Sequence, residues 1–126
     1  MADQAHVAIL MAVYQGREYL PAQLKSLAGQ THADWTLIAG DDGSTDGSAA
    51  LIEAFAAGLN PGQVRVLPGP RQGAAENFRA LLGHVPTEAT HVAFCDQDDV
   101  WDEGKLALGI AALPGWKLPY DLMPGN

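Results

Sequence analysis

The apolar run VAILMAV, residues 7–13, decides the fold class that this sequence predicts. Seven consecutive apolar residues without polar alternation are typical of a strand buried on both faces, as in a parallel sheet. Three more segments have strand character: WTLIAG at 35–40, QVRVL at 63–67 and HVAFC at 91–95. Apolar residues recur at helical spacing after each strand, in the segments 18–29, 51–59, 78–85 and 106–113. This alternation predicts an α/β fold with a mainly parallel sheet, right-handed crossovers and helices on both faces.

Composition and charge limit what this chain can bind. Its 126 residues are 48% hydrophobic, which is typical of one globular domain. The formal charge is −8, from 7 basic and 15 acidic residues (7 − 15), which argues against binding to nucleic acid. An acidic protein can still bind a phosphorylated ligand when a divalent cation lies between the two.

Cysteine, apolar and proline usage indicate the compartment and the domain limits. The only cysteine, Cys95, cannot form an internal disulfide, which favours a reducing, cytoplasmic location. The N-terminal stretch lacks the basic segment that begins a signal peptide, and no apolar run is long enough to span a membrane. We expect one domain over residues 1–113 and an atypical, proline-rich tail over residues 114–126.

Chemically distinctive loops follow each of the predicted strands. They read AVYQG, DDGSTDG, GPRQG and DQDDVW. In a parallel sheet these loops all leave from the carboxyl edge, where open α/β sheets bind their ligands. The order of elements therefore predicts a single ligand cleft that is lined by all of these loops.

The loop after the fourth predicted strand carries three aspartates within four positions, Asp96, Asp98 and Asp99. Side chains two residues apart at a strand end project to the same side, so Asp96 and Asp98 can share a cation. Carboxylate oxygens suit Mg²⁺ or Mn²⁺, which commonly take substrate phosphates as further ligands. The alternative is a polar loop whose aspartates, Asp102 above all, cap the following helix. The location behind a buried strand and beside a second acidic loop favours the metal site.

Four motifs in order resemble those of a known enzyme family. DQDDVW at 96–101, followed by Lys105, is similar to the signature of the inverting family 2 glycosyltransferases, which have the Rossmann-like GT-A fold. MAVYQGREYLPAQLKSLAGQT, IAGDDGSTDGS and RQGAAENFRALL resemble the family's earlier segments, and the rhamnosyltransferase-like branch is the most similar. The resemblance extends over roughly residues 6–113. It covers the N-terminal, nucleotide-binding half of such an enzyme, so the chain resembles a truncated GT-A domain.

The resemblance implies roles for particular residues in the predicted cleft. Tyr14 would stack on the nucleobase, and Asp42 would accept a hydrogen bond from a base N–H, which favours uracil or thymine over cytosine. Asp96 would contact the ribose or the metal, and Asp98 would be the principal metal ligand. The remaining residues implied to contact the nucleotide are Ala12, Arg71, Asn77 and Gln97.

These residues also have structural interpretations. The alternatives are an amphipathic strand end for Tyr14, a solvated loop charge for Arg71, and a helix cap or early helix polar residue for Asn77. The alternative for both Asp41 and Asp42 is to organise the Gly-Ser-Thr turn, which is the role expected for Asp41, and Trp101 is expected to pack. The chain departs from the family at Gln15, where Asn is usual, and at Ala12, where Pro, Thr or Ser is common. These departures bear on the fine geometry around the base and leave the fold unaffected.

The function that the resemblance implies is transfer of sugar from a UDP- or dTDP-linked donor, with Mn²⁺ or Mg²⁺ as cofactor. The acceptor would be a glycan or a lipid-linked molecule, which adds a peripheral membrane surface to the candidate partners. Inverting transfer needs a general base for the acceptor hydroxyl. In the family this carboxylate lies well downstream of the Asp-x-Asp loop, and no residue of this chain is assigned to it. We therefore expect the chain to be incomplete or inactive alone.

Two other classes of function stay open. One is a non-catalytic module, a dimerising or regulatory partner of a full-length transferase, in which a second copy covers the open sheet edge. The other is a receiver-like domain that binds Mg²⁺ at acidic strand ends. Such receivers need a lysine at the end of a later strand, and Lys105 and Lys117 are both misplaced for it. A stable homodimer would favour the non-catalytic module.

Overall fold

In residues 5–96 and 98–112, which the computed structural model describes, four strands alternate with four helices. The strands are β1 (Val7–Val13), β2 (Trp35–Asp41), β3 (Val64–Pro68) and β4 (His91–Cys95). The helices are α1 (Leu20–Ala28), α2 (Ser48–Ala56), α3 (Ala74–Leu82) and α4 (Lys105–Ala112). The predicted α/β order is confirmed. Two helices begin clearly earlier than predicted. α2 begins at Ser48 and leaves Leu59 beyond its end, and α3 begins at Ala74 and leaves Val85 beyond its end, although Leu59 and Val85 still pack against the core.

The four strands form one parallel sheet in the order β3-β2-β1-β4. β1 is a central strand, since Val7 pairs with Trp35 of β2 on one side and with His91 of β4 on the other. Every residue of β1 is buried. This position explains why no polar residue interrupts the run at 7–13.

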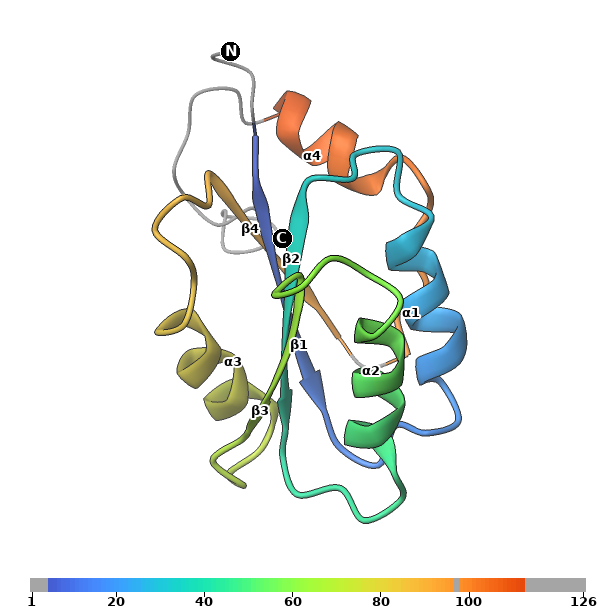
Figure 1. The fold of residues 1–126 in the computed structure, drawn as a ribbon. Coiled ribbons are helices and arrows are strands. Elements are labelled where there is room, and N and C mark those ends of the chain that lie inside the picture. Colours follow the sequence, from blue (N-terminus) through green and yellow to red (C-terminus); the bar gives the residue numbers. More distant parts are fainter. Residues whose placement is uncertain (1–4, 97, 113–126) are drawn as a thin grey trace.

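Helices cover both faces of the sheet, as predicted. Figure 1 shows α1, α2 and α4 on one face and α3 on the other. Successive side chains of β1 point to opposite faces, so Ile9 and Met11 pack under α1 and α2, whereas Leu10 packs under α3. On the α3 face the rings of Phe78 and Phe94 stack, with their centroids 4.9 Å apart.

The parallel register brings the carboxyl ends of the strands to one edge of the sheet. Asp41 of β2 pairs with Val13 of β1 and with Pro68 of β3. Cys95, at the end of β4, pairs with Met11 on the other side of β1. The loops that follow these strands therefore start beside one another, as the predicted cleft requires.

Residues 1–4, 97 and 113–126 lie outside the described residues. The predicted domain limit at 113 and the proline-rich tail therefore stay predictions. Within the described ranges, no helix is long and apolar enough to cross a membrane.

Candidate functional site

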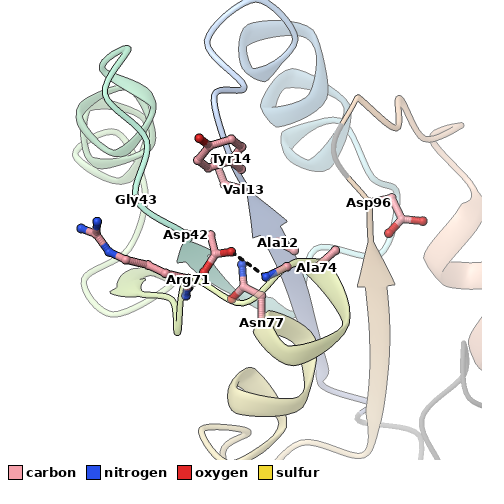
Figure 2. A pocket seen from close by; sticks show the side chains of 10 residues that line it. Ala12, Val13, Tyr14, Asp42, Gly43, Arg71, Ala74, Asn77 and Asp96 are labelled. Carbon is pink, nitrogen blue, oxygen red and sulfur yellow. Dashed lines mark hydrogen bonds between the residues drawn. The ribbon is translucent and has the colours of Figure 1, made fainter.

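A cavity of about 520 Å³ opens at the carboxyl edge of the sheet. This volume lies within the range of pockets that hold small molecules, about 300–1,000 Å³. Six of the residues predicted to contact a nucleotide line it: Ala12, Tyr14, Asp42, Arg71, Asn77 and Asp96. Gln97, the seventh, lies outside the described residues. The structure thus gathers residues from the ends of β1, β2 and β4 and from the start of α3 around one space (Figure 2).

Asp42 connects two walls of this cavity. Its carboxylate accepts hydrogen bonds from the backbone N–H groups of Arg71 and Gly73, the latter at 3.2 Å (Figure 2). Its own backbone N–H donates to the carbonyl of Val13 at 2.8 Å. Asp42 therefore joins the end of β1 to the loop between β3 and α3, residues 69–73, and holds that loop beside the cavity.

Asn77 is buried in the wall next to Asp42, with 1% of its surface exposed. It lies early in α3, whose N-cap is Gly73, so it is an early helix polar residue and not the helix cap. Its Nδ2 donates to the carbonyl of Gly40 at 2.8 Å, and among the described residues its buried Oδ1 has no hydrogen-bond partner. We call this part of the cavity wall the Asp42 side. It consists of Tyr14, Asp42, Asn77 and the loop 69–73.

Two glycines, neither of them among the predicted site residues, allow these side chains to come so close. A Cβ atom on Gly40 would lie 2.1 Å from Oδ1 of Asn77. A Cβ atom on Gly69 would lie 2.6 Å from Oδ1 of Asp42. A glycine inside a strand often marks such a close approach, and this is the only signal that the sequence offered for Gly40.

Arg71 takes an unusual backbone conformation, with φ at +62°. Its guanidinium lies against Gly43, where a Cβ atom would be 3.2 Å from Cζ of Arg71. Figure 2 shows this side chain directed away from Asp96. Arg71 is the only basic residue among those that line the cavity, so the Asp96 end has no basic residue in its described lining.

The loop after β2 is held to the loop after β1 by hydrogen bonds of a side-chain amide. Gln15 has φ at +52°, and its Oε1 accepts from the backbone N–H of Thr45 at 2.8 Å. Its Nε2 donates to Oγ1 of Thr45 at 3.1 Å. The departure from the family's Asn at this position is thus accommodated by a pair of bonds across the two loops. Oδ1 of Asp41 accepts from the backbone N–H of Ser44 at 3.0 Å, which confirms the structural role expected for Asp41.

Asp46, which is not among the predicted site residues, organises the start of α2. Its Oδ1 accepts from the hydroxyl of Ser48 at 2.5 Å and from the backbone N–H of Ser48 at 3.0 Å. Its Oδ2 accepts from the backbone N–H of Arg17 at 3.1 Å. The hydrogen bond from the Ser48 hydroxyl is the main cause that lowers the pKa of Asp46 below its ordinary value of 3.8. An aspartate two positions before a helix was the available signal.

The segment between β4 and α4, residues 96–104, is called the acidic loop below. Asp96 lines the cavity, and Asp98 is exposed with φ at +67°, a conformation that aspartate tolerates better than most residues. Asp99 closes a turn instead: its Oδ2 accepts from the backbone N–H of Asp96 at 3.2 Å, and its own N–H donates to the carbonyl of Asp96 at 3.1 Å. The Asp99 carboxylate is therefore engaged with the backbone of the loop, whereas no hydrogen bond holds the carboxylates of Asp96 and Asp98 among the described residues.

Trp101 packs, as expected. It is 7% exposed and belongs to the core cluster, and Nζ of Lys105 lies 5.1 Å from the centroid of its ring. Asp102 contributes to the turn before α4 through its carbonyl, which accepts from the backbone N–H of Lys105 at 3.0 Å.

The donor set at the acidic loop suits a cation that is shared with a ligand. In the described parts of the chain, no group of three or more His, Cys, Asp or Glu side chains is arranged to hold a metal. Mg²⁺ is usually held by one or two carboxylates together with substrate phosphates, and only rarely by an all-protein cage. Of the two predicted ligands, Asp96 lines the cavity, whereas Asp98 is exposed outside its lining.

The sequence profile of the family described as "Glycosyl transferase family 2" matches residues 8–114, a range that includes every lining residue of the cavity. The chain belongs to glycosyl transferase family 2. The resemblance carried by the four motifs is thereby confirmed.

Named relatives of this family 2 chain transfer sugars. It is 34% identical to the dTDP-rhamnosyl transferase RfbG of Shigella flexneri over 106 residues, which cover 82% of this chain and 36% of that protein. It is 28% identical to the UDP-Glc:alpha-D-GlcNAc-diphosphoundecaprenol beta-1,3-glucosyltransferase WfgD of Escherichia coli over 112 residues, 88% of this chain and 42% of that protein. The chain thus spans well under half the length of these curated relatives.

The fold agrees with a solved glycosyltransferase. The structure of the mannosyltransferase PcManGT from Pyrobaculum calidifontis in complex with GDP-Man and Mn²⁺ matches 89% of this chain, and 34% of that chain, with a TM-score of 0.77. The sequence identity is 19%, so this likeness concerns the fold alone. It confirms the predicted Rossmann-like GT-A architecture.

Proposed function

We propose that this family 2 domain binds a nucleotide diphosphate sugar in the carboxyl-edge cavity, with a divalent cation at Asp96 and Asp98. The bound donor would serve inverting transfer of its sugar to a glycan or lipid-linked acceptor. The observation that carries the proposal is the arrangement of Tyr14, Asp42 and Asp96 around a single cavity of about 520 Å³. The aromatic face of Tyr14 suits the base, and the fixed acceptor Asp42 suits the edge of the base. The Asp96 carboxylate suits a cation that would bind the diphosphate.

The Asp42 side suits the nucleobase. Tyr14 is 55% exposed, and its ring offers a face on which a base can stack. The Asp42 carboxylate only accepts hydrogen bonds when ionised, and it has lone pairs beyond the two that the loop N–H groups occupy. Uracil and thymine present a ring N–H to such an acceptor, whereas cytosine does not. The dTDP, UDP and GDP in the names of the related proteins all carry a base with a ring N–H.

The acidic loop suits a diphosphate only when a cation lies between them. The charged residues in the described lining of the cavity are two acidic ones, Asp42 and Asp96, and one basic one, Arg71. The Arg71 side chain points away from Asp96. A diphosphate would therefore meet a negative surface at this end of the cavity. Mn²⁺ or Mg²⁺ bound there would neutralise the diphosphate and make it a better leaving group. Asp96 and Asp98 would hold that cation and orient the phosphates for departure.

The general base and the acceptor pocket are assigned to no described residue, so the direct test of the proposal is binding. Calorimetric titrations would compare UDP, dTDP and CDP, each with and without Mn²⁺, on the wild type and on Asp98→Asn. Asparagine also tolerates a positive φ, so this variant removes the charge without straining the loop. Glu88→Gln, which removes one negative charge from an exposed position away from the cavity, is the matched control.

We expect UDP and dTDP to bind more tightly than CDP, and Mn²⁺ to strengthen binding in the wild type and in Glu88→Gln. In Asp98→Asn the Mn²⁺-dependent gain should fall by about tenfold or more, which corresponds to about 1.4 kcal/mol. Absence of binding under every condition would overturn the proposal. Combined with a stable dimer in solution, that outcome would favour the non-catalytic, dimerising module.

A further inference from the structure

Helix α1 places a row of polar side chains beside its apolar face. Gln23, Ser26 and Gln30 follow one another at helical spacing, and Gln30 lies just after the end of the helix. Gln23 is fully buried and Gln30 is 6% exposed. Burial of a side-chain amide is costly unless the amide is hydrogen-bonded, so these residues call for an explanation in terms of what they contact.

Their hydrogen bonds are made to the acidic loop and the start of α4. Nε2 of Gln23 donates to the carbonyl of Asp96 at 2.5 Å. Oγ of Ser26 accepts from the backbone N–H of Trp101 at 3.1 Å. These bonds join positions more than 70 residues apart in the chain, with separations of 73 and 75.

Gln30 continues the row at the far end of the loop. Its Nε2 donates to the carbonyl of Asp102 at 2.7 Å, and its Oε1 accepts from the backbone N–H of Leu106 at 3.1 Å. The backbone N–H of Thr31 also donates to the carbonyl of Glu103 at 2.8 Å. One face of α1 and the residues just after it therefore hold the backbone of the acidic loop from Asp96 onward.

The contact of Gln23 is the one closest to the predicted metal ligands. Asp96 is the first residue after β4, and the Gln23 bond holds its carbonyl at the start of the acidic loop. Only the amide nitrogen of Gln23 can donate to that carbonyl, so the side chain is held in one orientation. This orientation leaves Oε1 of Gln23 buried without a partner among the described residues. The bond to Asp96 is thus retained although the other half of the amide is left unsatisfied.

We propose that Gln23 is a positioning residue for the cation site, which fixes the start of the acidic loop so that Asp96 and Asp98 present their carboxylates together. Ser26 and Gln30 hold the rest of the loop in the same register. This inference rests on the proposed function, and it assigns part of the donor site to α1, which does not line the cavity itself. Residues that orient metal ligands from behind typically change metal affinity by roughly 10- to 100-fold when they are replaced.

The test compares Gln23→Met with Gln63→Met. Methionine keeps the length and approximate volume of glutamine but cannot donate a hydrogen bond. Gln63 lies in the shallow groove at the opposite, amino edge of the sheet, so its replacement is the matched control. The readouts are UDP affinity with Mn²⁺, UDP affinity without Mn²⁺, and uridine affinity from NMR titration. Uridine has no phosphate, so its affinity reports on the contacts of the base and the ribose and not on a cation shared with a diphosphate.

We expect Gln23→Met to weaken Mn²⁺-dependent UDP binding by about tenfold or more while uridine affinity stays within about twofold. Gln63→Met should change neither. Equal losses for uridine and for UDP with Mn²⁺ would show a general structural role and overturn the inference, as would unchanged UDP binding. If wild-type protein binds no UDP, the proposed function itself fails, which is a distinguishable result.

A second variant keeps the inference testable if Gln23→Met does not fold, as judged by circular dichroism. Ser26→Ala removes the acceptor of the Trp101 N–H and should weaken Mn²⁺-dependent UDP binding with uridine affinity unchanged. If Gln23→Met is unfolded and Ser26→Ala binds UDP as tightly as the wild type does, the inference is overturned.

Discussion

The Asp42 side of the cavity is built differently from the acidic loop, which contributes Asp96 to the described lining of the cavity. On the Asp42 side, the Asp42 carboxylate and the Asn77 amide are both held by backbone groups of other segments. At the acidic loop, Asp96 and Asp98 are exposed, and among the described residues their carboxylates accept no hydrogen bond. One end is thus preformed by the chain, whereas the other presents charges that the chain does not neutralise.

This difference indicates that the fold itself prepares the site for the base, whereas the acidic loop needs a cation before it can bind a diphosphate. A preformed acceptor can select a base because little reorganisation is needed when the base enters. Two exposed carboxylates repel a diphosphate unless a cation neutralises them. The Asp42 side should therefore respond to mutations that disturb packing and hydrogen bonds, and the acidic loop to changes in charge and metal.

The largest effect on the Asp42 side is expected from Asp42→Asn. The amide nitrogen of asparagine would face a backbone N–H donor of the loop 69–73, so one of two charge-assisted hydrogen bonds is lost and the base acceptor is weakened. We expect a loss of about 2–3 kcal/mol in uridine binding, roughly 30- to 150-fold in affinity. Asp41→Asn is the matched control, because its amide oxygen can still accept from Ser44. Equal affinities for the two variants would contradict a preformed Asp42 side.

Gly40→Ala should disturb the same side through packing alone. The new Cβ atom would lie 2.1 Å from Oδ1 of Asn77, so the Asn77 side chain must move. We expect the free energy of unfolding to fall by about 1–3 kcal/mol, as for other overpacked sites. Gly104→Ala, at a position where a Cβ atom meets nothing within 4 Å, serves as the control in chemical denaturation. A Gly40→Ala protein as stable as the control would show that Asn77 can be displaced without cost.

A smaller effect is expected for Gln15→Asn, which introduces the residue usual in the family. The shorter side chain cannot span the two loops to make both bonds to Thr45. The loss of an exposed pair of hydrogen bonds should cost about 1 kcal/mol locally. Hydrogen exchange at the Thr45 amide should accelerate while amides in α3 keep their rates. Unchanged exchange at Thr45 would show that the loops are held by other contacts.

The smallest effect concerns pH and the start of α2. Ser48→Ala removes the hydroxyl that lowers the pKa of Asp46, so that pKa should rise toward 3.8, as measured by NMR titration of the carboxyl carbon. Because the pKa is lowered in the folded state, the stabilisation is present above the ordinary pKa and is lost as the pH falls through the folded value. The wild type and Ser48→Ala should therefore differ in thermal stability by an amount that depends on pH, and this pH-dependent part should vanish in acid. Identical Asp46 pKa values would contradict this assignment.

The sequence predicted the parts of the fold that depend on local pattern. The unbroken run of β1 follows from burial on both faces, and the gathering of four loops at one edge follows from the parallel order. The family motifs then indicated Tyr14, Asp42 and Asp96, which line one cavity. These features need only periodicity, element order and motif spacing.

The parts that the sequence did not predict depend on distances between remote segments. Gly40 matters because Asn77, 37 residues away, occupies the space of its missing side chain. Gln23 bonds to Asp96 over a separation of 73 residues, and nothing in the spacing of α1 points to that partner. α2 begins at Ser48, before its apolar pattern, where the Asp46 carboxylate accepts from the backbone N–H of Ser48.

The central claim is that the acidic loop binds a nucleoside diphosphate through a divalent cation, whereas the Asp42 side binds the base without one. The most direct measurement compares uridine and UDP on the wild-type chain, each titrated with and without Mn²⁺. We predict that Mn²⁺ strengthens UDP binding by about tenfold or more, or roughly 1.4 kcal/mol, and leaves uridine affinity unchanged. UDP binding that is equally tight after removal of all divalent metal would contradict the account.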